Sequence, residues 1–134
     1  MELITAELRQ LIEEGVSQLP PSSKARNSFE IERKAAKFLV LKAQIADVVW
    51  ALERKYLEAS AVEKADFARA MDDIDVKTVS EKQLRASADA GYLEKKKEAS
   101  EYKVALEWLN TYDIIFTNAH IFYRQQMKQE QGEF

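Results

Sequence analysis

Residues 28–60 read SFEIERKAAKFLVLKAQIADVVWALERKYLEAS, a stretch without glycine or proline. Its apolar positions recur at alternating steps of four and three residues, the heptad spacing of a helix that packs against another helix. The stretch therefore predicts one long helix of about four heptads, roughly 45–50 Å in length, with Ser28 as its N-cap. Lys42 is its polar member, either a register-setting residue or the point where the seam meets solvent. The row consists of Ile31, Ala35, Phe38, Lys42, Ile45, Val49, Leu52 and Tyr56.

A second long helix is expected from about residue 89, with Asp89 as its N-cap, to about residue 131. Two neighbouring apolar rows follow it and make a stripe wider than one antiparallel partner helix covers. A second copy of the chain is the simplest partner that could bury the rest of this apolar stripe, which predicts a homo-oligomer. The first row is Tyr102, Leu106, Leu109, Asp113, Phe116, His120, Tyr123 and Met127, and the second is Ala105, Trp108, Tyr112, Ile115, Ala119 and Phe122. We assign oligomerisation to Tyr102, Leu106, Trp108, Leu109, Tyr112, Phe116, His120, Tyr123 and Met127.

The remaining segments are shorter. Residues 2–14 have amphipathic helical spacing, and Gly15 suits the left-handed position that closes a helix. LPPSSKARN, residues 19–27, predicts a linker because its two prolines stop a helix. Residues 66–90 begin acidic and lack long periodicity, so we expect an irregular connection with one or two short helical turns. Within it, Thr78-x-x-Glu81 has the pattern of a capping box.

Composition agrees with an all-α fold, since the chain of 134 residues has only three glycines and two prolines. We expect an antiparallel hairpin of two long helices, plus a short N-terminal helix and an irregular helical connection. Residues 1–18 form an N-terminal amphipathic helix arm, 19–27 a Pro-rich linker, and 28–134 a helical oligomerisation domain. The chain has no apolar run of membrane-spanning length and no basic N-terminal signal, which predicts a soluble, cytoplasmic protein with no membrane partner.

The residues that could carry chemistry are few. Cysteine is absent, which excludes disulfides and thiolate metal sites. His120 and Asp113 lie two helical turns apart without further ligands at metal-site spacing, so we interpret them as a polar pair hydrogen-bonded across a helix seam. The MDDIDVK segment, 71–77, lacks the glycine and terminal glutamate of a calcium loop and is interpreted as a solvated acidic turn. Without a phosphate loop, a nucleophile elbow or an HExxH motif, we expect no enzyme, no metal and no cofactor.

The net charge of −3 gives no global attraction to nucleic acid, so any such binding needs local basic groups. Three basic clusters stand out: ERKAAK (32–37), ALERKY (51–56) and EKKKE (94–98). Each contains glutamate, so each is either an ordinary salt-bridged face or a phosphate-contacting surface. The aromatic residues of 108–123 could stack on bases, but they recur at the spacing of a helix core or interface.

The layout resembles the phage UvsY family of recombination mediator proteins over most of residues 28–128. A long helix ends in ALERKYLEA (51–59), a connection carries KTV (77–79), and a helix with ALEWLNTYDIIFTNA (105–119) continues to Arg124 and Met127–Lys128. The family carries a Lys-x-Arg type motif after an Ala-Leu pair, implicated in binding single-stranded DNA. In this sequence Lys55 matches the second cation, Glu53 replaces the first, and Arg54 adds a cation between them.

The resemblance implies a ring of six or seven subunits assembled through the C-terminal helix. It also implies a non-enzymatic protein that binds single-stranded DNA, loosens single-strand-binding protein and loads a RecA-like recombinase, in the host cytoplasm if the chain is of phage origin. Domain 28–134 would then also bind DNA. Two alternatives remain: a phage protein-interaction module that inhibits or adapts a host complex through acidic residues 66–75, and a structural coiled-coil component. The candidate phosphate contacts are Lys42, Arg54, Lys55, Lys64, Lys95, Lys96 and Lys97.

Overall fold

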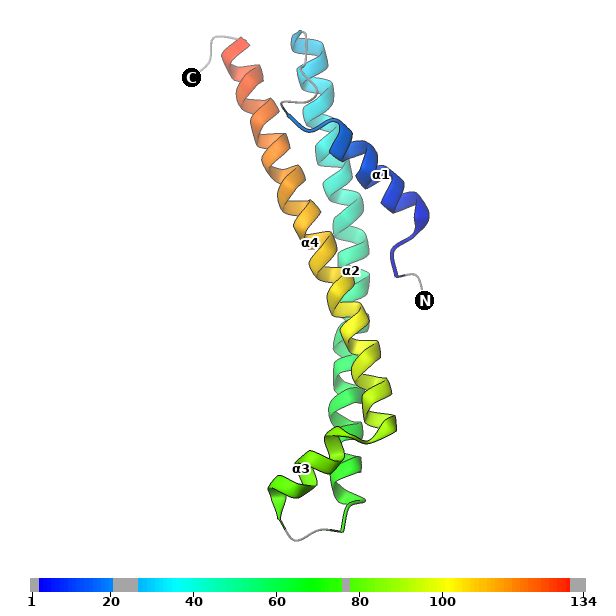
Figure 1. Cartoon of the computed structure of the whole chain (residues 1–134). Coiled ribbons are helices and arrows are strands. Elements are labelled where there is room, and N and C mark those ends of the chain that lie inside the picture. Colours follow the sequence, from blue (N-terminus) through cyan, green and yellow to red (C-terminus); the bar gives the residue numbers. More distant parts are fainter. Residues whose placement is uncertain (1–2, 21–26, 76–77, 131–134) are drawn as a thin grey trace. The chain divides into compact units, whose positions relative to one another are not determined.

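The computed structural model describes residues 3–20, 27–75 and 78–130. These residues form four helices and no strand: α1 (Ala6–Ser17), α2 (Ser28–Asp72), α3 (Val79–Ser87) and α4 (Ala90–Glu130) (Figure 1). The two long helices, α2 and α4, pack against each other as a helical hairpin. The expected all-α hairpin with a short N-terminal helix and a helical connection is confirmed.

Helix α1 begins after Thr5, whose hydroxyl accepts the Leu8 N–H at 3.2 Å. It continues through Gly15 to Ser17, so the prediction that Gly15 closes the helix was wrong. A Cβ built on Gly15 would lie 2.7 Å from Leu41 Cδ1 and 2.9 Å from Phe116 Cζ. Glycine at this position therefore serves close packing, because only the absence of a side chain lets those two residues approach the helix.

Helix α2 differs from the prediction at both ends. Its first N–H groups are capped by Asn27, whose Oδ1 accepts the Glu30 N–H at 2.9 Å, and Ser28 is already helical. The helix continues past the expected end near residue 60 to Asp72. Residues 61–72 contain no glycine or proline, so nothing local breaks the helix. Tertiary packing also holds this extension: Ala70 is buried, and the Phe67 ring lies 4.9 Å from the Tyr92 ring.

The starts of α3 and α4 follow the sequence patterns. The Thr78 hydroxyl accepts the Glu81 N–H at 3.2 Å, as its place in a capping box predicts. Asp89 Oδ1 accepts the Tyr92 N–H at 3.0 Å, which confirms Asp89 as the N-cap of α4. The predicted end of this helix near residue 131 and most of the predicted linker, residues 21–26, lie outside the described residues.

The chain divides into two compact units, each containing part of α2 and part of α4. Unit 1 comprises residues 1–50 and 107–134, and unit 2 comprises residues 51–106. In unit 1 the Phe38 ring lies 5.5 Å from the Phe116 ring and 5.9 Å from the Tyr123 ring. Large side chains at the predicted heptad positions thus form a well-packed core, as the spacing predicted. The buried apolar residues of this unit are Ile4, Leu8, Ile12, Ile31, Ala35, Phe38, Leu41, Ile45, Leu109, Phe116, Ala119 and Tyr123.

Helix α1 packs on its own chain within unit 1. Besides the contacts around Gly15, the Arg9 guanidinium lies 5.2 Å above the Trp108 ring. The helix thus packs on α2 and α4 of the same chain. It covers part of the second apolar row of α4, because Trp108 and Tyr112 line a small recess with four α1 residues, Ile12 among them. Part of the apparent surplus of apolar surface is therefore used within one chain.

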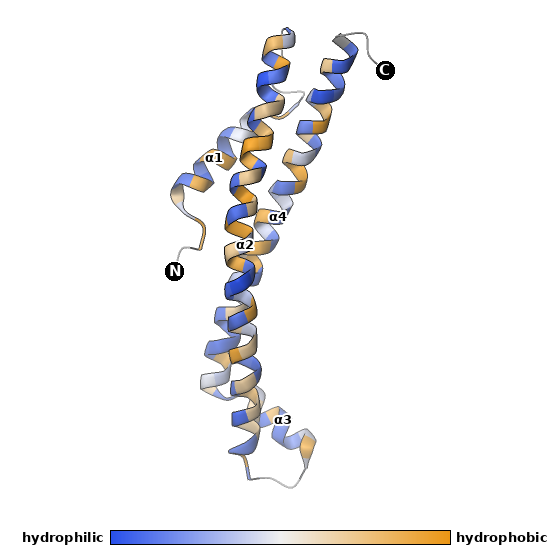
Figure 2. Cartoon of the chain, turned by 180° about the vertical axis from the view of Figure 1, so that it is seen from behind, coloured by the Kyte–Doolittle hydropathy of each residue, from blue (hydrophilic) through white to orange (hydrophobic). Residues whose placement is uncertain are grey.

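The core of unit 2 is built from smaller side chains. Four alanines contribute to it, and Tyr102 is its largest buried residue. Figure 2 shows hydrophobic and hydrophilic residues alternating along α2 and α4, as expected for helices with one buried face. In the described residues, no helix combines the length and apolarity that a membrane span requires. The buried apolar residues of unit 2 are Leu52, Ala70, Ala86, Ala99, Tyr102, Ala105 and Leu106.

Candidate nucleic-acid interface

Three of the predicted phosphate contacts lie on the part of α2 in unit 2. Arg54, Lys55 and Lys64 are all exposed. An α-helix turns by about 100° per residue, so Lys55 and Lys64, nine residues apart, lie on opposite sides of α2. Arg54 lies about a quarter-turn from Lys55. These cations therefore surround the helix and do not form a single stripe.

The other predicted contacts are divided between the two units. On α4 in unit 2, Lys96 and Lys97 are exposed and Lys95 is half-buried. Lys42 belongs to unit 1, where it is half-buried at the edge of the α2 seam. Consecutive positions on a helix point in different directions, so the three lysines of α4 also spread around their helix.

Glutamates interleaved with the lysines suggested an ordinary salt-bridged face, but this applies to only some of the candidate cations. Ion pairs in the described ranges include those of Arg69 with Asp66, Asp73 and Asp89, and of Arg85 with Glu81. Within those same ranges the candidate lysines at 55, 64 and 95–97 form no ion pair. Their charges are therefore neutralised by solvent and counterions, which a bound phosphate chain can replace.

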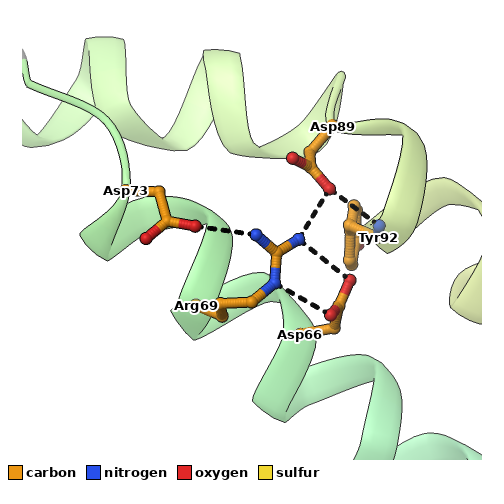
Figure 3. A network of polar contacts seen from close by, with 5 residues as sticks. All are labelled: Asp66, Arg69, Asp73, Asp89 and Tyr92. Atoms are coloured by element: carbon orange, nitrogen blue, oxygen red, sulfur yellow. Dashed lines mark hydrogen bonds and ion pairs between the residues drawn. The ribbon is translucent and has the colours of Figure 1, made fainter.

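The Arg69 network (Figure 3) joins the end of α2 to the start of α4 within unit 2. Arg69 Nη1 donates to Asp73 at 2.8 Å, Nη2 to Asp89 at 2.9 Å, and Nε to Asp66 at 3.1 Å. The hydrogen bonds that Arg69 donates to Asp66 and Asp73 raise the pKa of Arg69 further above its ordinary value. The pKa of Asp89 is lowered, first by the Tyr92 N–H and then by the charge of Arg69.

This network also decides which acidic residues of the 66–75 segment are available to bind a basic partner. Asp66 and Asp73 are already paired with Arg69, whereas Asp72 and Asp75 are exposed and have no ion-pair partner within the described residues. Because one guanidinium cancels only one charge, the acidic segment keeps most of its negative charge for a basic partner. Arg69, in turn, is committed to carboxylates and is a poor candidate for phosphate binding.

His120 is a polar member of the helix seam, as predicted, but the Asp113 side chain forms no hydrogen bond across the seam within the described residues. The Nδ1 of His120 lies 2.8 Å from the Ala35 carbonyl oxygen, across the contact between α4 and α2. Asp113 is half-buried, and its main-chain carbonyl accepts the Thr117 hydroxyl at 2.7 Å. Across residues 3–20, 27–75 and 78–130, no three histidine or carboxylate groups gather as metal ligands would. His120 therefore has a structural explanation in the hairpin.

The residues assigned to oligomerisation lie mostly inside the chain's own packing. Five of them, Tyr102, Leu106, Leu109, Phe116 and Tyr123, are buried, and the other four are half-buried: Trp108, Tyr112, His120 and Met127. The Tyr123 hydroxyl donates to the Gln18 carbonyl at 3.0 Å, and burial raises the pKa of this phenol. Their part in assembly stays a prediction. The exposed large hydrophobic residues of α4 are Leu93 and Val104 in unit 2 and Ile114, Ile121 and Phe122 in unit 1.

In unit 1, an open groove of about 590 Å³ lies between α4 residues, Phe122 among them, and the residues that follow α1. It contains no ionisable side chain, so it suits an apolar contact and not acid–base chemistry. A smaller recess of about 220 Å³ lies between α1 and α4, and its charged residues, Arg9 and Glu13, both come from α1. Sequence reasoning missed both hollows, because each requires α1 or the residues after it to be placed against α4. The larger groove is lined by Leu19, Pro20, Ile115, Asn118, Ala119 and Phe122.

Comparisons of the chain with protein-family models, with curated proteins and with solved structures find no match.

Proposed function

We propose that the protein is a non-enzymatic single-stranded DNA-binding factor of the recombination mediator type. The observation that carries this proposal is the set of exposed lysines in unit 2 that no carboxylate neutralises within the described residues. Lys55, Lys64, Lys96 and Lys97 belong to this set. Such cations bind phosphates chiefly by releasing counterions, so binding weakens steeply as salt is added.

The arrangement of these lysines favours a single strand over a duplex. They point in several directions around α2 and α4, whereas duplex DNA is stiff and presents its phosphates in fixed rows. A flexible single strand can bend to reach cations that do not share a face. The net charge of −3 makes each contact weak, so we expect useful affinity only when several copies bind one strand.

The role in recombination rests on the resemblance of the ALERKYLEA segment and the helix after it to recombination mediators. In this proposal Arg54 and Lys55 contact the strand, and the bound protein helps a RecA-like recombinase to displace single-strand-binding protein. Recombinase assembly on oligonucleotides coated with single-strand-binding protein tests this step. Faster assembly in the presence of the protein is expected, and an unchanged rate despite measurable DNA binding contradicts the mediator role alone.

DNA binding is tested by the fluorescence anisotropy of a labelled oligo-dT titrated with protein at several salt concentrations. We expect log K to fall with log salt, with a slope of about −0.7 for each phosphate contact. Replacing Lys55 and Lys96 by alanine should weaken binding and make the slope shallower by about one contact each. Arg85→Ala is the matched control, because Arg85 is an exposed cation already paired with Glu81. No binding at low salt by a fully helical protein contradicts the proposal.

A protein-interaction module is the second candidate, and the open groove beside α4 favours it. A groove lined by Leu19, Ile115 and Phe122 without charge suits an apolar side chain of a partner. This candidate predicts a partner that remains bound after nuclease treatment and that is lost when Phe122 is replaced by glutamate. It also predicts no affinity for oligo-dT, which distinguishes it from the first candidate.

A further inference from the structure

Helix α2 carries a second row of apolar residues at heptad spacing, in addition to the row that packs inside the chain. Leu39 and Trp50 of this row are 54% and 66% exposed, and Val40 beside it is 57% exposed. The three alanines of the row, at positions 36, 43 and 46, are exposed as well. Positions 36, 39, 43, 46 and 50 follow one another at steps of three and four residues, the spacing of a helix–helix seam. We call this set the outer row, and it consists of Ala36, Leu39, Ala43, Ala46 and Trp50.

The outer row faces away from the packing of unit 1. Ala43 lies two positions from both Leu41 and Ile45, which are 3% and 0% exposed. Two positions on a helix correspond to about 200°, so Ala43 points opposite to the buried row. Neither α1 nor α4 therefore covers this face in the described structure. All residues of the outer row belong to unit 1, so its geometry depends on this unit alone.

A second copy of α2 fits this face better than an unrelated partner, because a heptad row packs best on another heptad row of equal spacing. The small side chains at 43 and 46 let two helices approach closely in the middle, with Leu39 and Trp50 closing the contact on either side. A contact of five residues a side is small for a specific interface. We therefore expect a weak dimer, with a dissociation constant of about micromolar order.

The charges beside the row favour a parallel pairing. If positions 36, 43 and 50 are a positions, Lys42 is a g position and Asp47 is the following e position. In a parallel pair, a g residue meets the e residue of the next heptad on the other helix. Lys42 of one copy would therefore meet Asp47 of the other, twice by symmetry. Within the described residues neither side chain has an ion-pair partner in its own chain.

We propose that two copies of the chain associate through parallel pairing of their α2 helices along the outer row, with an ion pair between Lys42 and Asp47 of the two copies on each side. This pairing does not require nucleic acid. It assigns Lys42 to assembly and removes it from the phosphate contacts. It also gives self-association a surface that the folded chain leaves exposed, unlike the buried first row of α4.

The first test is the mass of the protein in solution by sedimentation equilibrium, up to about 100 µM, a concentration well above a micromolar dissociation constant. We expect a monomer–dimer equilibrium without DNA. Leu39→Glu should shift it to monomer, with unchanged helicity by circular dichroism because Leu39 is exposed. Leu84→Glu is the matched control, since Leu84 is 72% exposed on α3, outside the row, and should leave the dimer intact. A wild-type monomer at the highest concentration overturns the proposal.

Disulfide cross-linking tests the orientation, because the chain has no cysteine of its own. In the parallel pair each Ala43 faces the same residue of the other copy, so Ala43→Cys should form a disulfide-linked dimer on mild oxidation. Ser100→Cys, an exposed position on α4, is the control and should stay monomeric on the gel. A disulfide that forms only between Ala43→Cys and Ala46→Cys chains, when the two variants are mixed, overturns the parallel arrangement.

A charge exchange tests the ion pair itself. Lys42→Glu and Asp47→Lys should each weaken association by about fivefold, since each removes two exposed ion pairs from the dimer. The double variant should recover most of that loss, because the exchanged charges meet again across the interface. The two positions are five residues apart on one helix and do not face each other within a chain. Equal weakening by the single and the double variants contradicts the pairing.

Discussion

The two units use the same pair of helices but are held together by different means. Unit 1 encloses large side chains, with Phe38, Ile45, Leu109 and Phe116 fully buried. Unit 2 buries mainly alanines and adds the exposed Arg69 network between α2 and α4. The comparison indicates that burial of aromatic and aliphatic groups stabilises unit 1, whereas helix propensity and polar links carry more of unit 2. Exposed lysines accumulate in the second unit, where less of the surface is needed for packing.

The largest expected effect comes from removing a ring of the unit 1 core. Phe116→Ala should lower the free energy of unfolding by about 3–5 kcal/mol, because the ring is fully buried and its loss leaves a cavity beside Phe38. Urea unfolding followed by tryptophan fluorescence measures the change within the same unit, since Trp50 and Trp108 both belong to it. Ile114→Ala is the control, since Ile114 is 61% exposed on the same helix and should cost well under 1 kcal/mol. Similar losses for both variants contradict a core at Phe116.

The two described helical glycines allow a direct comparison of the units. Gly15→Ala should destabilise the protein by about 1–2 kcal/mol, because the new methyl group meets Leu41 and Phe116 and this overpacking exceeds the gain in helix propensity. Gly91→Ala, in unit 2, should be neutral or slightly stabilising. Its Cβ would lie 3.3 Å from the flexible ends of Arg69 and Asp66, which can move. Thermal unfolding measures both, and equal destabilisation by the two variants contradicts the tight packing of α1.

A smaller effect is expected from the loss of one hydrogen bond in unit 1. Tyr123→Phe removes the hydrogen bond from the Tyr123 hydroxyl to the Gln18 carbonyl but keeps the buried ring. The free energy of unfolding should fall by about 1 kcal/mol. Tyr112→Phe is the comparison, because its half-buried ring packs on Trp108 and no hydrogen bond joins its hydroxyl to another described residue. An unchanged unfolding midpoint for Tyr123→Phe contradicts the role of its hydroxyl.

The smallest effect concerns the Arg69 network in unit 2. The pKa of Asp89 is lowered below its ordinary value of 3.8, so its stabilising contribution is present above that value and is lost as the pH falls through the lowered pKa. Hydrogen exchange at the Tyr92 amide, which donates to Asp89, should therefore speed up in Asp89→Ala at neutral pH and in the wild type only in strong acid. Asp72→Asn is the control and should leave this amide unchanged, since Asp72 lies outside the network.

Periodicity predicted much of the fold because it reports directly which side of a helix is buried. The rows containing Phe38 and Phe116 were identified from spacing alone, and the caps at Thr78 and Asp89 from local motifs. The end of α2 was missed because the acidic residues after position 66 looked like a break. The helix nevertheless continues to Asp72, where Arg69 pairs with Asp66 and Asp73 and Phe67 packs on Tyr92. Local sequence does not reveal a partner that lies about twenty residues away.

The candidate site was predicted less completely than the fold. Lysine positions can be read from the sequence, but their directions follow from the continuity of α2, which places Lys55 and Lys64 on opposite sides. The docking of α1 depends on shape, because the glycine at position 15 must meet Leu41 and Phe116. For the same reason the wide stripe of α4 predicted a partner but not which one.

The amino-acid sequence by itself determined that the chain is helical, where the buried seams of α2 and α4 run, and that no cysteine chemistry is possible. These properties follow from residue type and spacing, which act over one or two helical turns. Only the tertiary structure decided that α1 covers part of the α4 stripe and that Arg69 gathers three carboxylates. It also decided that the outer row of α2 stays exposed. Each of these depends on which residues distant in sequence meet in space, and helical periodicity carries no information about that.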